Sequence, residues 1–427
     1  MIRSAPPSGH GRRQRVPPGL TRGGPGFEGL DILGEIPGDL GVVLWRSMRN
    51  VMIWAFTPAT RRAGLFDPAA ADARAAELAR VEPDAELLAP LSVIVALLES
   101  PERVEVPRLV NACRRVALWA ETRGALGTAL DFAQAAALAQ PDAASLAFAV
   151  GRLARRRAEY DRAESWYTRA IVQGRQSGDW RSYALAFSGL GNMYVQRGNY
   201  PKARRAHIRT LRAARRHGLT GLQGDAYHAL FGLQVETGAG PEADVLAARA
   251  FDAYGGAHAK VARLAYDVAY HWALRGLFAS ALSVAEALVP HFEAPAERAL
   301  VFGLLARAAG GVGERATFER AELELRALLA MERSDDSAAR AYLGLSHGAA
   351  SLGEWELAIH AGAEAVRTAS ARREGRVLLE AEAALEAARH HVLPPVAPVP
   401  GEGENVPLAD TFVRALTSVA EAVGASG

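Results

Sequence analysis

Hydrophobic residues recur at helical spacing along most of the chain, and the clearest example lies between residues 184 and 217. Four residues spaced three, one and three apart share one helix face: Phe187, Leu190, Gly191 and Tyr194. The segment Gly-Asn-Tyr-Pro at 198–201 interrupts the pattern, because glycine ends a helix and proline is tolerated in the first turn of the next. The pattern predicts two antiparallel helices joined by a tight turn, with Ala203 brought back toward Gly191.

The same alternation of small and aromatic positions recurs elsewhere. Small residues equivalent to Gly191 are separated by 34, 40, 41, 37 and then 77 residues, at Ala117, Gly151, Gly191, Gly232, Ala269 and Ser346. A poorer unit surrounds Gly303, inside the longest interval. Chance rarely preserves a period over so many units, so the sequence predicts an array of helix pairs.

This spacing of large, small and aromatic residues resembles the tetratricopeptide repeat, over about residues 101–390. The longer intervals resemble the extended repeats of bacterial regulatory proteins in the same superfamily. The resemblance implies an all-α fold, a right-handed superhelix (α-solenoid) of antiparallel helix pairs in which each unit buries its apolar face against its neighbours.

Composition divides the chain further. Pro, Gly and Arg dominate the N-terminal tail, which has too few apolar residues to offset its ordering entropy, and a Pro-rich stretch precedes the last helix. We expect six segments: a disordered tail at 1–38, an N-terminal helical cap or degenerate repeats at 39–100, the repeat array at 101–373, a capping helix at 374–391, a Pro-rich linker at 392–408 and a short amphipathic helix at 409–427.

Two amphipathic segments leave alternatives open. Residues 42–56 carry Trp45 and Trp54 beside arginines, and would either cap the end of the array or lie on a membrane surface. The cap is favoured, because terminal repeats must be covered and the stretch is too short to span a bilayer. The C-terminal helix would dock on the scaffold, on a second copy of the chain, or on nothing, so a homo-oligomer stays open.

Charge and cysteine content exclude some kinds of site but do not alter the predicted fold. The formal net charge is +2, and Cys113 is the single cysteine, so an intrachain disulfide framework and a Cys-rich zinc site are excluded. The basic N-terminus has no apolar run after it, unlike a secretory signal. We expect a cytoplasmic protein.

No constellation of catalytic residues emerges. The sequence has no HExxH zinc motif, no Gly-x-Ser-x-Gly elbow and no P-loop. We therefore expect no enzyme activity, no cofactor and no metal. The arginines of residues 202–216 lie on a second helix, which in this fold faces outward to solvent, and with the low net charge this argues against a nucleic-acid partner.

The resemblance also implies where a partner would bind. In tetratricopeptide arrays the first helix of each pair lines a concave groove, and the matching positions here are Arg152, Arg156, Ser188, Asn192, Gln196, Arg263, Tyr266, Tyr270 and His347. Asn192 offers both a donor and an acceptor to a peptide backbone, and the three arginines suit carboxylates. The clamp that binds chaperone tails is not matched, because its basic positions hold Ser188, Ala226 and Leu230.

These observations predict a non-catalytic scaffold that holds a peptide or partner segment in its groove. The alternative is a sensor module that changes superhelical pitch when a signal peptide or small molecule binds, as in the repeat domains of bacterial transcriptional and quorum-sensing regulators. The longer repeat period favours the sensor, and the lack of a recognisable output domain favours the scaffold.

Overall fold

The structure is a computed structural model that describes residues 29–81, 83–238, 240–330, 337–372, 374–393 and 406–424. The chain divides into two compact units, Met1–Leu222 and Gln223–Gly427. Throughout the described ranges the regular elements are helices, with no strand. The all-α helical-repeat fold expected from the sequence is confirmed. The first 28 residues of the expected tail and most of the Pro-rich linker lie outside the described residues.

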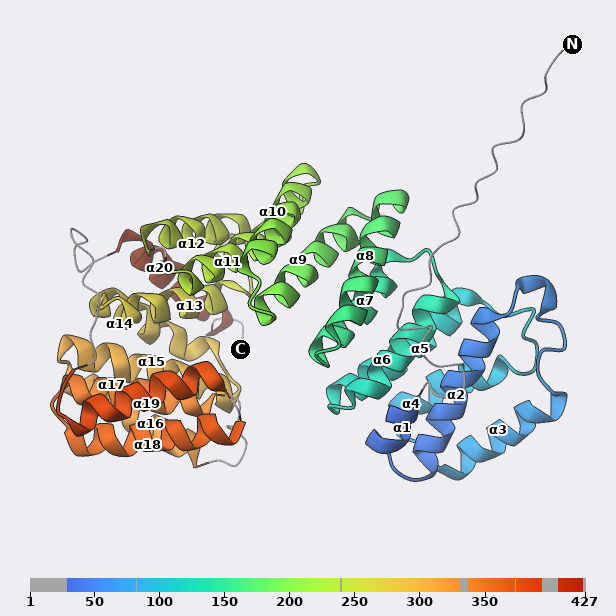
Figure 1. The fold of residues 1–427 in the computed structure, drawn as a ribbon, viewed down its shortest axis with the longest axis horizontal. Helices are drawn as coiled ribbons and strands as arrows, with labels where there is room; N and C mark the ends of the chain where they lie inside the picture. Colours follow the sequence, from blue (N-terminus) through green and yellow to red (C-terminus); the bar gives the residue numbers. More distant parts are fainter. Residues whose placement is uncertain are drawn as a thin grey trace, which may run out of the picture. The chain divides into compact units, whose positions relative to one another are not determined.

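In the first unit, helices that follow one another in sequence pack side by side (Figure 1). Its elements are α1 (Leu30–Glu35), α2 (Asp39–Phe56), η2 (Ala59–Arg61), α3 (Pro68–Val81), α4 (Ala85–Ala96), α5 (Val106–Thr122), α6 (Leu126–Ala139), α7 (Ala144–Arg156), α8 (Tyr160–Ser177), α9 (Trp180–Gln196) and α10 (Tyr200–Arg216). The boundary between the units falls within α11 (Thr220–Glu236).

The second unit continues the pattern of paired helices. Its remaining elements are α12 (Gly240–Tyr254), α13 (Val261–Leu274), α14 (Phe278–Leu288), η3 (Val289–His291), α15 (Pro295–Val312), α16 (Arg315–Leu329), α17 (Ala338–Ser351), α18 (Trp355–Arg372), α19 (Gly375–Arg389) and α20 (Pro407–Gly424). Helix α15 packs against both α16 and α17, and α17 against α18, so first helices of successive pairs touch each other as well as their own partners.

Small residues on the first helix of a pair admit large rings from the second. A Cβ atom at Gly151 in α7 would lie 2.8 Å from the ring of Tyr167 in α8, so only glycine leaves room for that ring. Tyr167 and its neighbour Trp166 are both buried, and removing a large side chain of this kind from water is worth about 2 kcal/mol. The pairing of α7 with α8 therefore rests on the small-to-large complementarity that the repeat pattern predicts.

The central pair, α9 and α10, differs from expectation in one contact. Its turn is as predicted, with Gly198 at a φ of +68° and the side chain of Asn199 accepting a hydrogen bond from the Lys202 amide at 3.1 Å. The atoms nearest to Gly191, however, belong to the imidazole of His207, one turn beyond Ala203. Because glycine leaves a hollow on α9, a ring fills it, and an alanine one turn earlier is not the residue that packs there.

The contact between α15 and α17 is closer still. A Cβ atom at Gly303 of α15 would lie 2.7 Å from the Cα atom of Ala341, and one at Gly344 of α17 would collide with the carbonyl group of Gly303. Further along, a Cβ at Gly310 would lie 2.5 Å from the Cα of Gly348. These two helices therefore meet backbone to backbone, which is possible only because glycines face each other at both levels.

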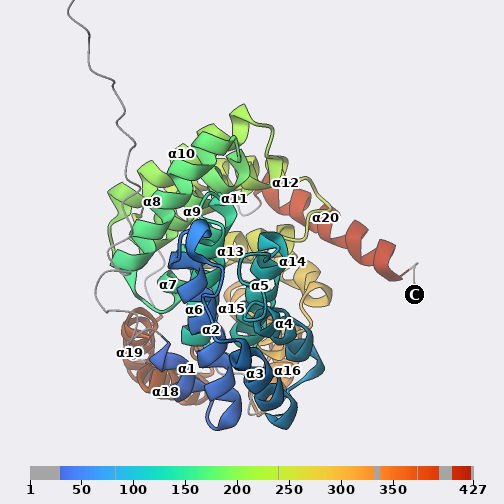
Figure 2. The ribbon, with the colours of Figure 1, turned by 90° about the vertical axis from the view of Figure 1, so that its right-hand side faces the viewer.

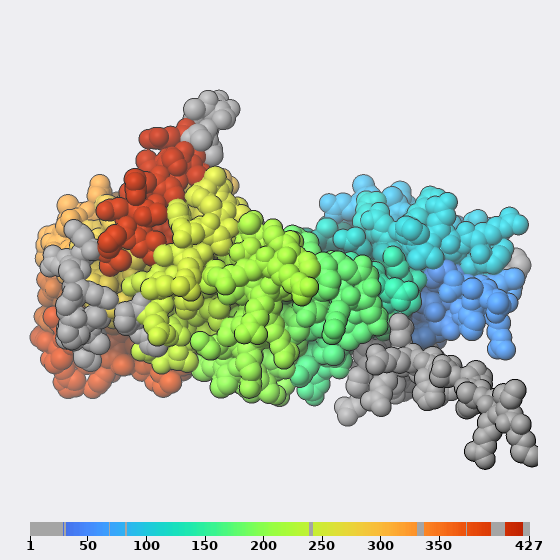
Figure 3. Space-filling view, turned by 90° about the horizontal axis from the view of Figure 1, so that it is seen from above, coloured from blue at the N-terminus to red at the C-terminus, as the bar shows by residue number. Residues whose placement is uncertain are grey.

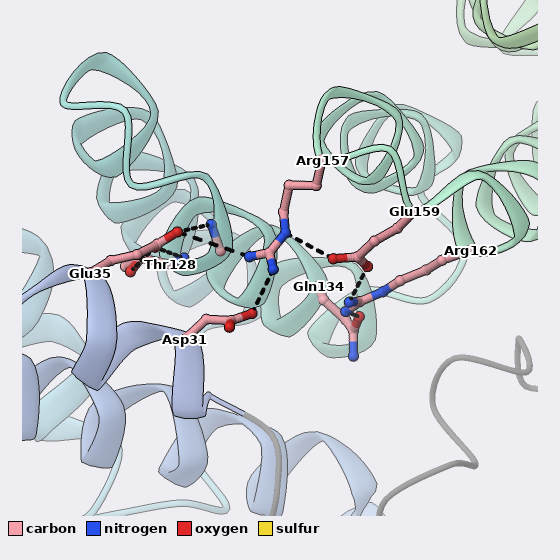
Figure 4. A network of polar contacts seen from close by, with 8 residues as sticks. Asp31, Glu35, Thr128, Gln134, Arg157, Glu159 and Arg162 are labelled. Atoms are coloured by element: carbon pink, nitrogen blue, oxygen red, sulfur yellow. Dashed lines mark hydrogen bonds and ion pairs between the residues drawn. The ribbon is translucent and has the colours of Figure 1, made fainter. Parts of the chain in front are cut away.

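Helix α1 lies in the segment that composition led us to expect as a disordered tail, and it is fixed by a contact far along the chain. The carboxylate of Glu35 accepts hydrogen bonds from the amides of Gly127 and Thr128, both at 2.7 Å, and from the Thr128 hydroxyl at 2.8 Å (Figure 4). Arg157 joins the same network through Asp31 at 2.9 Å. Glu35 thus supplies the negative charge and the acceptor that the N-terminus of α6 lacks in its own sequence.

We predict that Glu35→Ala lowers the free energy of unfolding of the first unit by roughly 2 kcal/mol, because three hydrogen bonds to a carboxylate at a helix N-terminus are lost. Urea unfolding monitored by circular dichroism measures this change. Glu99→Ala is the matched control, because Glu99 is exposed. Equal midpoints for the two variants would show that the network does not stabilise the unit.

The tryptophan-rich helix α2 buries its apolar face against α4 and α6 (Figure 2). Trp54 is 1% exposed and donates a hydrogen bond to the carbonyl oxygen of Pro101 at 2.7 Å, and Leu44 and Met48 are buried with it. No helix within the described residues is long and apolar enough to cross a membrane.

Helix α20 docks within the second unit, along the helices coloured yellow in Figure 3. Phe412 is fully buried and its ring meets that of Phe251 edge-on, with centroids 5.4 Å apart. Leu416 is 2% exposed, and its carbonyl oxygen lies 3.0 Å from Nε2 of His291. Of the three fates left open for this helix, the structure shows docking on its own scaffold.

Candidate functional site

Two of the groove residues expected from sequence are engaged inside the first unit. The two terminal guanidinium nitrogens of Arg152 in α7 donate to the carboxylate of Glu121 in α5, at 2.5 and 2.6 Å, and Arg156 donates to the same carboxylate. The hydrogen bond from Arg152 lowers the pKa of Glu121, and that of Arg152 is raised in turn. A partner carboxylate would have to displace Glu121 to reach either arginine.

Three further residues form a polar stripe on α9. Ser188, Asn192 and Gln196 are spaced four residues apart, so they share one helix face, and Asn192 and Gln196 are exposed. Their side chains make no hydrogen bond to other described residues, which leaves both the donor and the acceptor of each amide available. This stripe provides polar contacts without a charge.

The remaining four expected residues lie in the second unit, and the structure brings three of them together. The rings of Tyr266 and Tyr270 in α13 are nearly parallel, with centroids 6.3 Å apart. Burial raises the pKa of both phenols, so each stays protonated and is able to donate a hydrogen bond. Arg263 is exposed and pairs with Asp267, one turn along its own helix, at 3.4 Å.

Beside these rings lies Arg307 of α15, which sequence reasoning did not single out. Its side chain is 8% exposed, it forms no ion pair with any described residue, and its Nε atom has no hydrogen-bond partner. Burial lowers the pKa of Arg307, while Tyr270 and Glu380 oppose that change. A buried guanidinium without an anionic partner costs free energy. Favourable contacts elsewhere in the fold must offset that cost.

Helix α17 adds His347 and Arg340 to the same place. Burial and the positive charge of Arg307 lower the pKa of His347 to about 3, so the imidazole is neutral at physiological pH. Arg340 is exposed, has no ion pair with any described residue, and acts electrostatically on both tyrosines. We call these five residues the Arg307 cluster: Tyr266, Tyr270, Arg307, Arg340 and His347.

An ion-pair bridge shows that first helices far apart in sequence approach each other around this cluster. Arg376 of α19 contacts the carboxylate of Glu236 in α11, and its Nε donates to Glu380 at 3.0 Å. Tyr270 is acted on by the charges of Arg307, Glu380, Arg340 and Arg376 together. The cluster therefore lies on the side of the unit where α11, α13, α15, α17 and α19 converge.

The chemistry of the cluster is that of an anion site. It offers two guanidinium groups without ion pairs among the described residues, two phenolic donors and a neutral imidazole. The two carboxylates that act on its tyrosines are already paired, Glu380 with Arg376 and Asp267 with Arg263. Among the described residues, no group of His, Cys and carboxylate side chains converges as a metal site would. The arrangement can hold a carboxylate or another oxyanion by charge-assisted hydrogen bonds.

One segment of the chain matches a family model, and it contains the best-matching repeats. Residues 142–216 match the model of the tetratricopeptide repeat, and this segment contains the whole of α7, α8, α9 and α10. The chain carries tetratricopeptide repeats. Proteins of this family are generally non-catalytic repeat scaffolds, and their repeats bind other proteins. No curated protein matches the sequence.

Two solved structures are similar to the chain. One, described as the TPR2AB-domain:pHSP90-complex of yeast Sti1, shares 16% identity and covers 66% of this chain and 99% of its own, with a TM-score of 0.26. The other is a circular tandem repeat protein with novel repeat topology and enhanced subunit contact surfaces, at 16% identity, covering 91% of this chain and 100% of its own, with a TM-score of 0.18. Both TM-scores are low, so neither superposition informs the site.

The position of Arg307 within its repeat could have identified it as a groove residue from sequence. With Gly303 at the small position of its unit, Arg307 falls four residues later, at one of the positions that line the groove in tetratricopeptide repeats. The surrounding sequence, Ala-Leu-Val-Phe-Gly-Leu-Leu-Ala-Arg-Ala-Ala, is so apolar that the unit matched the repeat pattern poorly.

Proposed function

We propose that the protein is a scaffold that holds an acidic segment of a partner protein at the Arg307 cluster. The observation that carries the proposal is the buried guanidinium of Arg307, which has neither an ion pair nor a partner for its Nε atom among the described residues. The tetratricopeptide repeats support a protein partner, and the charge of the cluster supports an anionic group on that partner.

A carboxylate suits the cluster better than a neutral group. A guanidinium binds a carboxylate through two parallel hydrogen bonds, and such bonds are about twice as strong as neutral ones. Tyr270 and Tyr266 hold their protons, so each can donate to a second oxygen, and the neutral imidazole of His347 does not repel a neighbouring cation. The Ser188–Gln196 stripe and the arginines on Glu121 are not needed for this anchor.

We predict that Arg307→Met weakens the binding of acidic peptides by at least about tenfold, because a charge-assisted hydrogen bond contributes roughly 1.5–3 kcal/mol. Peptides are first selected from a random-sequence library on the full-length protein, and their affinities are then measured by isothermal titration calorimetry. The selected peptides should be enriched in Asp and Glu.

Two controls keep this experiment decisive. Arg249→Met removes an equal charge from an exposed position in the same unit and should leave affinity unchanged. Arg307→Met should melt at the same temperature as wild type or higher, because it removes a buried charge that has no ion pair. Selected peptides that lack acidic residues and bind Arg307→Met as tightly as wild type would rule out the proposal.

The bridge formed by Arg376 favours a second candidate, a sensor module. Arg376 contacts Glu236 on α11 and Glu380 on α19, so an anion that competes for this guanidinium would release one helix from the other. Spin labels at two exposed positions, Thr237 directly after α11 and Leu379 in α19, report the distance between the end of α11 and α19. A change in that distance when a selected peptide is added would support the sensor. An unchanged distance would leave the scaffold as the only candidate function.

A further inference from the structure

The first unit contains a basic pocket remote in sequence from the Arg307 cluster. It has a volume of about 870 Å³ and lies between α8 and α10, with α9 at its base. Four arginines line it: Arg175 from α8, and Arg209, Arg212 and Arg216 from α10. No carboxylate is among the lining residues. We call this space the α8–α10 pocket.

The charges of these arginines are not neutralised within the described residues. None of the four forms an ion pair there, and α10 itself contains no Asp or Glu. Neighbouring arginines behave differently: Arg162 pairs with Glu159 at 2.9 Å, and Arg152 is held by Glu121. Four like charges around one pocket repel each other, so an anionic occupant would be stabilised there.

The pocket also has an apolar side. Tyr183 and Trp180 from α9 are partly exposed, and Val172 on α8 is 49% exposed although its neighbours are largely buried. Arg209, Arg212 and Arg216 are spaced three and four residues apart, so they form one row along α10 about 10 Å long. A row of cations beside an apolar strip complements a helix that carries acids on one face and apolar residues next to them.

We propose that the α8–α10 pocket binds an acidic amphipathic helix of a partner protein, as a second interaction surface that the proposed function does not require. Carboxylates at i, i+3 and i+7 of that helix pair with the arginine row on α10. An adjacent apolar side chain contacts Val172 and Tyr183. Arg175 closes the opposite rim by contacting a further carboxylate.

A protein partner is favoured over single-stranded nucleic acid because the aromatic faces are already occupied. Trp180 stacks on His217, with centroids 4.3 Å apart and planes 8° from parallel, and Tyr183 meets its ring edge-on at 5.6 Å. Phe187 is buried, and Arg209 lies over its ring at 5.4 Å. Stacking of bases needs bare aromatic faces, and the stack with His217 and the contact with Arg209 leave fewer of them here.

The test uses a fluorescent synthetic peptide of about 18 residues, with Glu at the stated spacing and Leu beside it, and a scrambled peptide of equal composition. Anisotropy is measured with the full-length protein at physiological ionic strength, for wild type, for Arg209→Gln with Arg212→Gln, and for Arg204→Gln with Arg249→Gln. The last double variant removes the same charge outside the pocket. An oligouridine of about 12 nucleotides is titrated in parallel.

The patterned peptide should bind wild type and the Arg204/Arg249 variant alike, and should lose at least about tenfold in affinity on the Arg209/Arg212 variant. Equal binding of the scrambled peptide, equal losses in both double variants, or tighter binding of oligouridine would each overturn the proposal. Because Arg307 is unchanged in every variant, binding of the peptide at the Arg307 cluster would be equal in all of them and could not produce a loss confined to the Arg209/Arg212 variant.

Discussion

Gly344→Ala is expected to destabilise the second unit by on the order of 3 kcal/mol, although it adds a single methyl group to a helix. The new Cβ atom would collide with the carbonyl oxygen of Gly303 and lie 2.7 Å from its carbonyl carbon. These are backbone atoms, so no side-chain rotation relieves the contact, and α15 and α17 must separate. Separation also weakens the packing of Phe318, which is fully buried nearby.

The matched control is the same substitution at Gly232, inside α11. A Cβ atom there has nothing within 4 Å. Alanine favours a helix over glycine by about 1 kcal/mol, so Gly232→Ala should leave stability unchanged or raise it slightly. Differential scanning calorimetry compares both variants with wild type. If Gly344→Ala and Gly232→Ala melt at the same temperature, then the backbone contact between α15 and α17 does not hold the unit together.

The second large effect is a loss of stability at low pH that comes from His207. This imidazole is fully buried against Gly191, neither ring nitrogen has a hydrogen-bond partner, and burial lowers its pKa from 6.5 to about 4. Between these two pH values the unfolded chain binds a proton that the folded chain does not, so stability falls as the pH is lowered. The loss from this residue is about 3 kcal/mol in total, and it is complete below pH 4.

We therefore predict that His207→Leu flattens the pH dependence of the first unit, measured by urea unfolding at pH 7, 5.5 and 4. The variant should lose about 3 kcal/mol less than wild type over this range, because leucine does not titrate. All other ionisable groups are common to both proteins, so they cancel in the comparison. His207→Met should behave in the same way. Parallel pH profiles for wild type and both variants would contradict the burial of a neutral His207.

Much of the repeat fold could be predicted from sequence because its determinants are local. Gly151 and Tyr167 lie within one repeat, and the turn at Gly198 is encoded by adjacent residues. Helix α1 could not be found this way. It is only six residues long and is held by Glu35, whose partners lie 92 and 93 residues further along the chain. No local pattern contains that contact.

The residues of the candidate site divide in a similar way. Tyr266, Tyr270 and His347 occupy the expected repeat positions, and the structure brings them together. Arg307 was missed because its burial depends on the convergence of α13, α15 and α17, which no single repeat encodes. The pairing of Arg152 with Glu121 could not be predicted from sequence either, because it joins two repeats through side chains 31 residues apart.

We propose the Arg307 cluster as the place where a partner's acidic segment binds. The most direct test is photo-crosslinking of a selected acidic peptide that carries a benzophenone next to its carboxylate, with the labelled residues mapped by mass spectrometry. We expect labelling in α13, α15 and α17 that is lost in Arg307→Met. Labelling confined to α8–α10, or spread evenly along the chain in both proteins, would contradict it.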